Sequence, residues 1–341
     1  MQKKHKVVSV GCGVIANEWL TKALKRTDME FVALVDLNKE AADKLAARYG
    51  LTCPTFTDLG EAIKHTGADL VFDLTIPASR FQVSTTALQH GCDVFSEKPM
   101  AATMEEAREL IAQADRSGKS YSVMQNRRYE AHIRAYRDLV QSETIGKPGY
   151  IGADFFIGAH FDGFRVLMDS PLVLDMAIHT FDQARFIIGA EPVSVYCHEF
   201  NPPGSWYKGN AAAIAIFEMS NGAVFCYRGS WCAEGAPTSW EASWRVTGEL
   251  GTAIWDGNEA PYAEIVAPGD QGGKFMKDYS RIESDFQWEK LTGHAGCLDE
   301  MFAALKEGRP AETDCRDNIS SIAMVLGAVE SAATGKKVYL S

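Results

Sequence analysis

The sequence predicts an α/β protein in which a doubly wound parallel sheet is followed by an α+β domain with an open, mainly antiparallel sheet. Its 341 residues suffice for about two domains. Up to about Asn126, short apolar runs alternate with segments of helical period, which is typical of βαβ units. From about Ala153 onward the candidate strands are longer and more nearly alternating, as in antiparallel sheets. We therefore predict domains at residues 1–127 and 128–341.

Five strands and two clear helices are predicted in the first domain. The predicted strands are residues 7–10, 31–35, 70–74, 93–96 and 120–124. They are apolar enough for helices to cover both faces of the sheet. Helical periodicity is clearest in Lys39–Tyr49 and Glu105–Arg116. The second of these helices runs into Ser117-Gly118, the glycine stop expected at a helix end.

The second domain is predicted to be a sheet followed by a helical tail. Its predicted strands are residues 151–157, 193–200, 211–219, 223–231, 239–247 and 252–255. Asn221-Gly222 predicts a tight hairpin between two of them. The tail is predicted to be helical over residues 293–305 and 318–334, with Gly335 as a cap.

Aromatic residues concentrate in the predicted sheet of the second domain. Trp240 and Trp244 are predicted to share one strand face, as are Phe225 and Tyr227. An aromatic sheet face is either core or a subunit interface, and an exposed apolar face would be a liability. We therefore expect a homodimer or homotetramer formed through this sheet.

Composition excludes several classes of partner. With 34 positive and 45 negative residues the formal net charge is 34 − 45 = −11, and no basic run offsets it, so nucleic-acid binding is not expected. No apolar stretch is long enough to span a membrane. The basic residues 1–6 precede an apolar run that breaks at Gly11, too short for a secretory signal, so we predict a cytoplasmic protein. The eight cysteines include no C-x-x-C pair and are interpreted as small buried hydrophobes, with zinc or redox use as the alternative.

A glycine-rich turn follows the first predicted strand. Gly11-Cys12-Gly13-Val14-Ile15-Ala16 fits G-x-G-x-x-G/A between a strand and a helix, which lets a pyrophosphate approach the backbone at the helix N-terminus. The next strand ends in Asp36, 20 residues after Ala16, where a carboxylate can accept both hydroxyls of an adenosine ribose. Helix capping is the alternative role for this acid. Leu37 and Asn38 follow it instead of an arginine, so the site indicates a Rossmann domain that binds NAD rather than NADP.

Ser96-Glu97-Lys98-Pro99 comes directly after another strand of the first domain. The carboxyl ends of parallel strands face the ligand crevice, and Pro99 restricts the backbone of Lys98. A lysine held beside the positive charge of a nicotinamide loses its proton more easily and can hydrogen-bond a substrate hydroxyl. A solvated surface lysine is the alternative.

Asp175, His179 and Asp182 have the spacing of one face of a helix. An imidazole between two carboxylates gains basicity and a fixed ring orientation, as a general base needs. Metal binding is a possible use of this spacing, but no cysteine or second histidine completes a ligand set, so no metal is predicted. A chance histidine on the helix face is the other alternative.

Together these motifs resemble the glucose–fructose oxidoreductase / inositol dehydrogenase family (Gfo/Idh/MocA-type) of NAD(P)-dependent enzymes. The resemblance covers most of the chain and rests on four motifs in order: Gly11-x-Gly13-x-x-Ala16, Glu97-Lys98-Pro99, Asn126-Arg127-Arg128-Tyr129 and Asp175-x-x-x-His179-x-x-Asp182. The tail Gly308-Arg309-Pro310 with its following helix is also similar to the family. It implies a Rossmann domain, nicotinamide at the domain junction and an oligomer formed through the C-terminal sheet. The chain departs from many members at Phe81, where they have a histidine.

The resemblance, added to the motifs, gives a set of expected site residues. The expected catalytic residues are Lys98, His179 and Asp175. The expected cofactor contacts are Gly11, Gly13, Val14, Ile15, Asp36, Leu37, Thr75, Pro77, Glu97, Lys98, Asn126 and Arg165. The expected substrate contacts are Lys98, Asn126, Arg128, His160, Asp162, Arg165, Asp175 and His179.

The expected activity is NAD-dependent oxidation of a hydroxyl of a small sugar. We favour oxidation of an aldose at C1 to its lactone, with a pentose or a branched pentose such as apiose as substrate. The alternatives within the family are oxidation of a secondary alcohol of a polyol, inositol or glycoside, reduction of a keto-sugar, and NAD-assisted glycoside cleavage. A non-catalytic NAD-sensing regulator is the alternative from another class.

Overall fold

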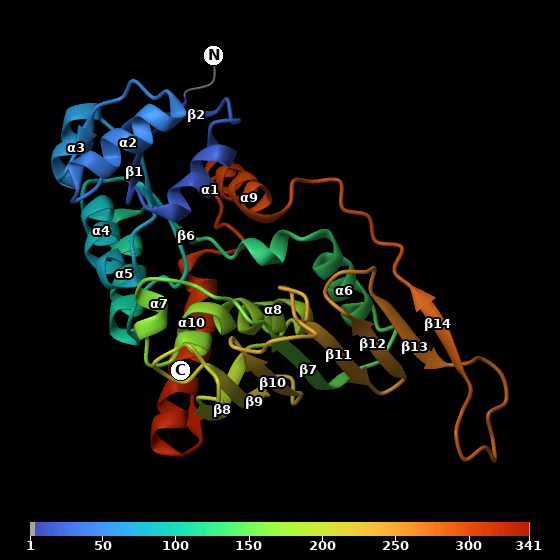
Figure 1. The fold of residues 1–341 in the computed structure, drawn as a ribbon. Helices are drawn as coiled ribbons and strands as arrows, with labels where there is room; N and C mark the ends of the chain where they lie inside the picture. The colour runs from blue at the N-terminus through green and yellow to red at the C-terminus, as the bar shows by residue number, and fades with distance from the viewer. Residues whose placement is uncertain (1–3, 341) are drawn as a thin grey trace. The chain divides into compact units, whose positions relative to one another are not determined.

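A computed structural model of the chain describes residues 4–340 (Figure 1). Residues 1–3 and 341, which belong to the ends of the two predicted domains, and in part to the basic N-terminal segment, lie outside the described residues. The chain forms two compact units, Met1–Asn126 with Leu291–Ile322 and Arg127–Lys290 with Ala323–Ser341. The first unit ends at Asn126, one residue before the predicted boundary at residue 127. Residues 291–322 belong to the first unit, although the prediction placed them in the second domain.

The first unit contains a six-stranded sheet and its helices. Its elements are β1 (His5–Val10), α1 (Val14–Ala23), β2 (Met29–Val35), α2 (Lys39–Tyr49), β3 (Thr55–Phe56), α3 (Leu59–Thr66), β4 (Leu70–Asp73), α4 (Pro77–Gln89), β5 (Asp93–Ser96), α5 (Met104–Ser117), β6 (Tyr121–Val123) and α9 (Gly293–Glu307). The strand order is β3-β2-β1-β4-β5-β6, and every neighbouring pair is parallel. This is the order of dinucleotide-binding sheets, with the ligand crevice where β1 and β4 adjoin. The predicted doubly wound sheet is confirmed.

Helix ends in the first unit follow from single residues. The side chains of Asn38 and Thr103 accept backbone N–H groups at the starts of α2 and α5, at 3.1 Å in both cases. Gly50 and Gly118 close the same helices in the left-handed conformation. These signals explain why the predicted bounds of α2 agree with the structure and those of α5 differ by one residue at each end.

The tail segment joins the first unit because α9 packs on that unit. The Phe302 ring lies 5.2 Å from the Phe95 ring of β5. Arg26, just after α1, places its guanidinium 4.3 Å from the same Phe302 ring and donates to Asp299 at 3.0 Å. Apolar periodicity predicted the helix, but periodicity does not say which of two sheets a tail helix covers.

The second unit is built on a nine-stranded sheet. Its elements are α6 (Ala131–Gln141), β7 (Pro148–Phe156), α7 (Phe164–Leu167), η2 (Leu172–Ala177), α8 (Ile178–Ile188), β8 (Pro192–Phe200), β9 (Ala212–Met219), β10 (Val224–Ser230), β11 (Ser243–Gly248), β12 (Gly251–Trp255), β13 (Tyr262–Val266), β14 (Tyr279–Glu283) and β15 (Val338–Tyr339). Two elements cross the division of the chain, the 3₁₀ turn η1 (Asn126–Tyr129) and α10 (Cys315–Thr334). The strand order is β14-β13-β12-β11-β7-β10-β9-β8-β15, antiparallel except for β7 with β10. The predicted α+β domain with an open, mainly antiparallel sheet is confirmed.

The two faces of this sheet differ sharply. On one face α8 packs against the strands (Figure 1), and its Phe181 ring lies 4.9 Å from Phe217 and 5.2 Å from Tyr227. Ile216 pairs with Tyr196 and is 43% exposed on the other face. Apolar residues thus line both faces, and among residues 4–340 only one face has helices packed against these side chains while Ile216 on the other stays exposed.

The aromatic pattern predicted for the strand around Trp240 is wrong in one respect. Trp244 lies in β11 and is 1% exposed, but Trp240 precedes the strand and is 45% exposed. The strand begins later than predicted because a turn intervenes: Ala242 has φ +65° and donates its N–H to Ser239 O at 3.1 Å. The two tryptophans therefore do not share a strand face.

Candidate active site

The turn from β1 into α1 leaves room for a phosphate group. Gly11 has φ +91°, and a Cβ there would lie 2.8 Å from the Leu74 carbonyl oxygen, so the position requires glycine. A Cβ on Gly13 would meet nothing within 4 Å, so the space in front of it is open. Ala16 is fully buried and brings α1 close to the sheet. Open space before a helix N-terminus with its exposed N–H groups fits a pyrophosphate.

Asp36 follows β2 and holds the neighbouring backbone. Its Oδ2 accepts the N–H of Cys12 at 2.8 Å, and its Oδ1 accepts the N–H of Asn38 at 2.9 Å. Each carboxylate oxygen keeps capacity for a further donor. The side chain therefore fixes the glycine turn and can at the same time accept ribose hydroxyls.

We expect Asp36→Ala to weaken NAD⁺ binding by about 10- to 100-fold, the range for hydrogen bonds to a charged group. The ratio of the affinities for NAD⁺ and NADP⁺ should also decrease, because the variant lacks the negative charge that repels a 2′-phosphate. Fluorescence titration with NADH and NADPH measures both effects. Glu40→Ala, which removes an exposed carboxylate from the first turn of α2, is the matched control and should bind like wild type.

Apolar side chains stand exposed at the carboxyl ends of three neighbouring strands. Val14 is 91% exposed, Leu37 90% and Ile76 57%. Exposed branched side chains at a ligand edge fit the flat faces of an adenine ring. Val14 and Leu37 were predicted as cofactor contacts. Ile76 was not, although it directly precedes the predicted Pro77.

Lys98 is fixed through its neighbour Glu97, whose carboxylate is buried. Glu97 Oε1 accepts the indole N–H of Trp19 at 2.6 Å, and Oε2 accepts the backbone N–H of Lys98 at 3.1 Å. Burial raises the pKa of Glu97, but His294, Trp19 and Lys98 outweigh it and hold the pKa below its usual range. Glu97 is therefore an anion that anchors the start of the Lys98 segment, and Trp19 is a supporting residue that the motif alone did not indicate.

A buried arginine joins the two loops that carry Thr75 and Lys98. Arg80 of α4 is 2% exposed and donates to the carbonyl oxygens of Thr75 and Pro99. It also lies beside the buried Asp73, which accepts hydrogen bonds from Ser84 at 2.8 Å and from the Thr75 hydroxyl at 2.5 Å. Arg80 thus ties the ends of β4 and β5 together, a role that only the fold reveals.

The catalytic residues predicted in the second unit lie on two kinds of helix. Asp175 belongs to the π-helical turn η2, whereas His179 and Asp182 belong to α8. The wider turn of η2 replaces α-helical spacing at Asp175, whereas His179 and Asp182 keep the spacing of an α-helix. Asp175 accepts a hydrogen bond from the Arg165 guanidinium, and His179 is 8% exposed. Single π-helical turns within helices are frequent at functional sites.

Two further predicted substrate contacts have strong partners of their own. Arg128 is 4% exposed, and its Nε and Nη2 each donate to an Asp182 oxygen at 2.7 Å. His160 lies 2.6 Å from Glu234 and stacks on Trp206 at a centroid distance of 3.8 Å. Arg128 is thereby part of a buried ion pair, whereas His160 forms an exposed aromatic surface of the kind that holds sugar faces. Asp162 is exposed on the same loop.

Two features of residues 4–340 bear on metal and thiol use. No group of three or more metal-ligating side chains occurs among them. Burial, reinforced by Asp36 and Cys53, raises the pKa of the Cys12 thiol to about 12. Cys12 is therefore a neutral thiol in the glycine turn. Likewise, none of the helices in the described part of the chain is long and apolar enough to cross a bilayer.

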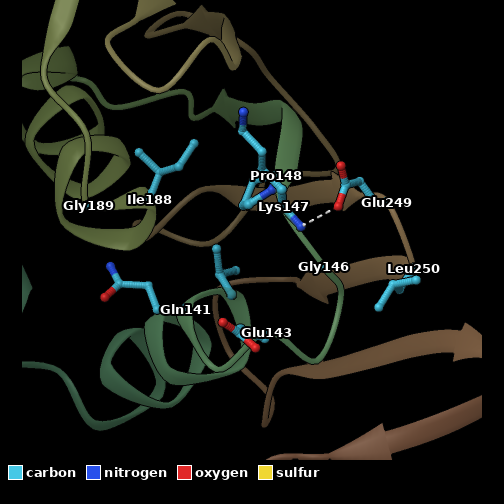
Figure 2. Close-up of a pocket in the computed structure, with 10 residues that line it drawn as sticks. Gln141, Glu143, Gly146, Lys147, Pro148, Ile188, Gly189, Glu249 and Leu250 are labelled. Carbon is cyan, nitrogen blue, oxygen red and sulfur yellow. Dashed lines mark hydrogen bonds between the residues drawn. The ribbon is translucent and has the colours of Figure 1, made fainter.

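Figure 2 shows a hollow in the second unit beside the end of α8. It is lined by residues such as Gln141, Lys147 and Glu249. The Gln141 amide donates to the carbonyl oxygens of Phe186 and Ile187 at 3.2 and 3.0 Å, which satisfies the end of α8. Among the described residues, none that was predicted for cofactor, substrate or catalysis lines this hollow.

The strand order, the open glycine turn and the acid after β2 define a dinucleotide-binding protein of the Rossmann class. Residues 5–125 match the oxidoreductase family with an NAD-binding Rossmann fold, and residues 133–254 match the Gfo/Idh/MocA C-terminal domain. The chain therefore belongs to the Gfo/Idh/MocA family, as predicted. It is an NAD-dependent oxidoreductase.

Relatives of the chain carry out several sugar reactions. The chain is 23% identical to the 1,5-anhydro-D-fructose reductase of Ensifer adhaerens, over 96% of each protein. It is also 23% identical to a D-apiose dehydrogenase of Rhizobium rhizogenes, over 96% of this chain and 95% of the relative. An oxidoreductase from Agrobacterium radiobacter, solved with NAD⁺, L-tartaric acid and magnesium, has the same fold, with a TM-score of 0.85 at 21% identity over 99% and 98% of the two chains.

Proposed function

We propose that this protein oxidises the C1 hydroxyl of a small aldose to the lactone, with a pentose or branched pentose as substrate. The observation that carries the proposal is the Lys98 segment. It follows β5 at the carboxyl edge of the NAD-binding sheet, and buried Glu97 anchors it there. The relative named D-apiose dehydrogenase supports the choice of a branched pentose.

Three side chains carry the proposed proton chemistry. Lys98 donates a hydrogen bond to the hydroxyl oxygen and stabilises negative charge as the carbonyl forms. His179 accepts the hydroxyl proton, and Asp175, held by Arg165, orients the imidazole. NAD⁺, when bound, accepts the hydride. General acid–base catalysis of this type accounts for about 10²- to 10⁴-fold of the rate.

The remaining proposed contacts divide between cofactor and substrate. The proposed cofactor contacts are Gly11, Gly13, Val14, Ile15, Asp36, Leu37, Thr75, Pro77, Glu97, Asn126 and Arg165. His160, Asp162, Arg128 and Asn126 are proposed as substrate contacts. His160 with Trp206 supplies an aromatic surface for the apolar face of a sugar. The reaction draws on NAD and a free sugar together, which fits the predicted cytoplasmic location.

The choice of carbon is tested with sugars that differ only at C1. We expect NADH to form with NAD⁺ and a free pentose but not with its methyl glycoside, and the product to be a lactone. Equal rates with the glycoside would instead identify a secondary-alcohol dehydrogenase. Oxidation of NADH by 1,5-anhydro-D-fructose, without oxidation of any aldose, would identify a keto-sugar reductase, which the relative from Ensifer adhaerens makes the second candidate.

We further propose that two copies associate through the uncovered face of the nine-stranded sheet. Branched and aromatic side chains on this face are 40–47% exposed on neighbouring strands: Tyr196, Phe200, Ile214 and Ile216. A continuous apolar face of this kind is normally covered by a partner. Light scattering should show a dimer or tetramer at micromolar concentration, and a monomer there would contradict the proposal.

A further inference from the structure

His294 comes from a distant part of the chain and lies beside two predicted cofactor contacts, Asn126 and Glu97. It is the second residue of α9, and its side chain is 19% exposed. The imidazole Nδ1 lies 3.4 Å from the amide nitrogen of Asn126. Its Nε2 lies 3.9 Å from Glu97 Oε1. One ring thus faces both the residue that anchors Lys98 and a predicted cofactor contact.

The two contacts are compatible with one tautomer of the neutral ring. In the tautomer in which Nδ1 accepts from the Asn126 amide nitrogen, the ring proton is on Nε2. That N–H faces the Glu97 carboxylate, which also accepts from the Trp19 indole. The amide of Asn126 is oriented with its nitrogen toward the imidazole, so its oxygen is the end that can accept from a ligand.

The elements that carry these groups are firmly packed. Arg26, next to α1, donates to Asp299 of α9 at 3.0 Å, and the buried Trp19 belongs to α1. Glu97 is 6% exposed, so a cationic or N–H partner is needed to keep its carboxylate charged. Glu18 Oε1, on α1, also faces the ring, 3.9 Å from Nδ1. The imidazole therefore has a defined place between three elements rather than a loose surface position.

We propose that His294 is a positioning residue that holds Lys98, through Glu97, and the Asn126 amide in place for the nicotinamide ring and the substrate hydroxyl. The inference rests on the proposed function, because Lys98 and Asn126 are assigned by it. His294 acts through other residues and touches neither reactant.

The experiment compares the fluorescence of bound NADH and the sugar kinetics in wild type, His294→Ala and His90→Ala. His90 is an exposed histidine of the same unit, at the end of α4, and its imidazole Nδ1 lies 2.8 Å from the Thr86 carbonyl oxygen. We expect His294→Ala to shift the emission of bound NADH, which reports the nicotinamide ring, and to lower kcat about 10- to 100-fold, as a misplaced catalytic group does. The KM for NAD⁺ should change less than about threefold, because the adenine end of the site is untouched.

Two further measurements separate positioning from packing. His294→Asn keeps a polar atom near Nδ1 and His294→Gln keeps one near Nε2, so each should recover part of the activity. In a Glu97→Gln background the effect of His294→Ala on kcat should be smaller than in wild type, since the part that acts through Glu97 is already lost and only the part that acts through Asn126 remains.

Three results would overturn the inference: His294→Ala matching His90→Ala in emission and kcat, the Ala, Asn and Gln variants behaving alike, or additive effects with Glu97→Gln. If wild type bound NADH but oxidised no sugar, the proposed function would fail. The emission comparison, which needs no substrate, would still decide whether His294 orders the nicotinamide site.

Discussion

Replacing His179 with asparagine is expected to lower kcat for sugar oxidation by at least ~100-fold, the lower end of the range for loss of a general base. The buried ring follows the π-helical turn that carries Asp175. Asparagine retains hydrogen bonding at this position but cannot accept a proton at neutral pH. NAD⁺ affinity should stay within about threefold of wild type, because the mutation removes an interaction of the transition state.

The matched control is His132→Asn, which changes an exposed histidine of α6 that contacts the Asn258 carbonyl. It should keep wild-type turnover. Steady-state kinetics and a thermal melt of each variant separate loss of chemistry from loss of folding. Near-normal turnover of His179→Asn with intact NAD⁺ binding would exclude His179 as the base and leave Lys98 to take the proton.

Replacing Arg80 with methionine is expected to destabilise the protein by about 2–5 kcal/mol at neutral pH, because two carbonyl groups lose their donor and the buried Asp73 carboxyl loses a nearby cation. Arg80 is 2% exposed and is the cation beside the buried Asp73. Its loss also leaves the Thr75 and Pro99 carbonyls without that donor. Because these carbonyls flank the Lys98 loop, any folded variant should in addition have lower kcat.

The pH dependence of this destabilisation has a definite sign. Burial raises the pKa of Asp73, and Arg80 opposes that shift. Without Arg80 the pKa rises further, so the folded variant binds the proton more tightly than the unfolded chain does, and its stability falls as pH rises. The stability difference from wild type should therefore be larger near about pH 8 than near about pH 5.

Urea unfolding at both pH values measures this difference. Arg48→Met is the matched control, since Arg48 is exposed and bonds only to Asn17 among the described residues, at 2.7 Å. It should change stability by less than about 0.5 kcal/mol, as ordinary surface substitutions do. A small loss of stability in Arg80→Met, or a loss of stability that grows toward acid pH, would contradict the role assigned to Arg80 beside Asp73.

Local chemistry explains why so much of the Rossmann unit could be predicted. The strands are buried on both faces, so they read as apolar runs, and Gly11 satisfies a steric demand that no other residue meets. Asp36 could be placed because the strand length and the glycine motif fix its distance from the turn. These are properties of short segments.

Long-range packing explains what could not be predicted. His294 lies 168 positions from Asn126, and no spacing rule connects them. Arg80 resembles any helix arginine until the fold buries it between two loops. The turn around Asp175 has a helical pattern, but its widening into a π-helix depends on packing rather than on periodicity. The supporting residues were therefore missed because only the fold brings them together.

The central claim is that this protein transfers hydride from a sugar hydroxyl to NAD⁺ with the help of Lys98. The measurement that tests it most directly is NADH formation by the purified protein across a panel of aldoses and polyols, with Lys98→Ala and NADP⁺ in parallel. We predict turnover of a pentose or branched pentose, weaker with NADP⁺ and lost in Lys98→Ala. No NADH from any sugar, with NAD⁺ still bound, would contradict the claim and favour a keto-sugar reductase or an NAD-sensing regulator.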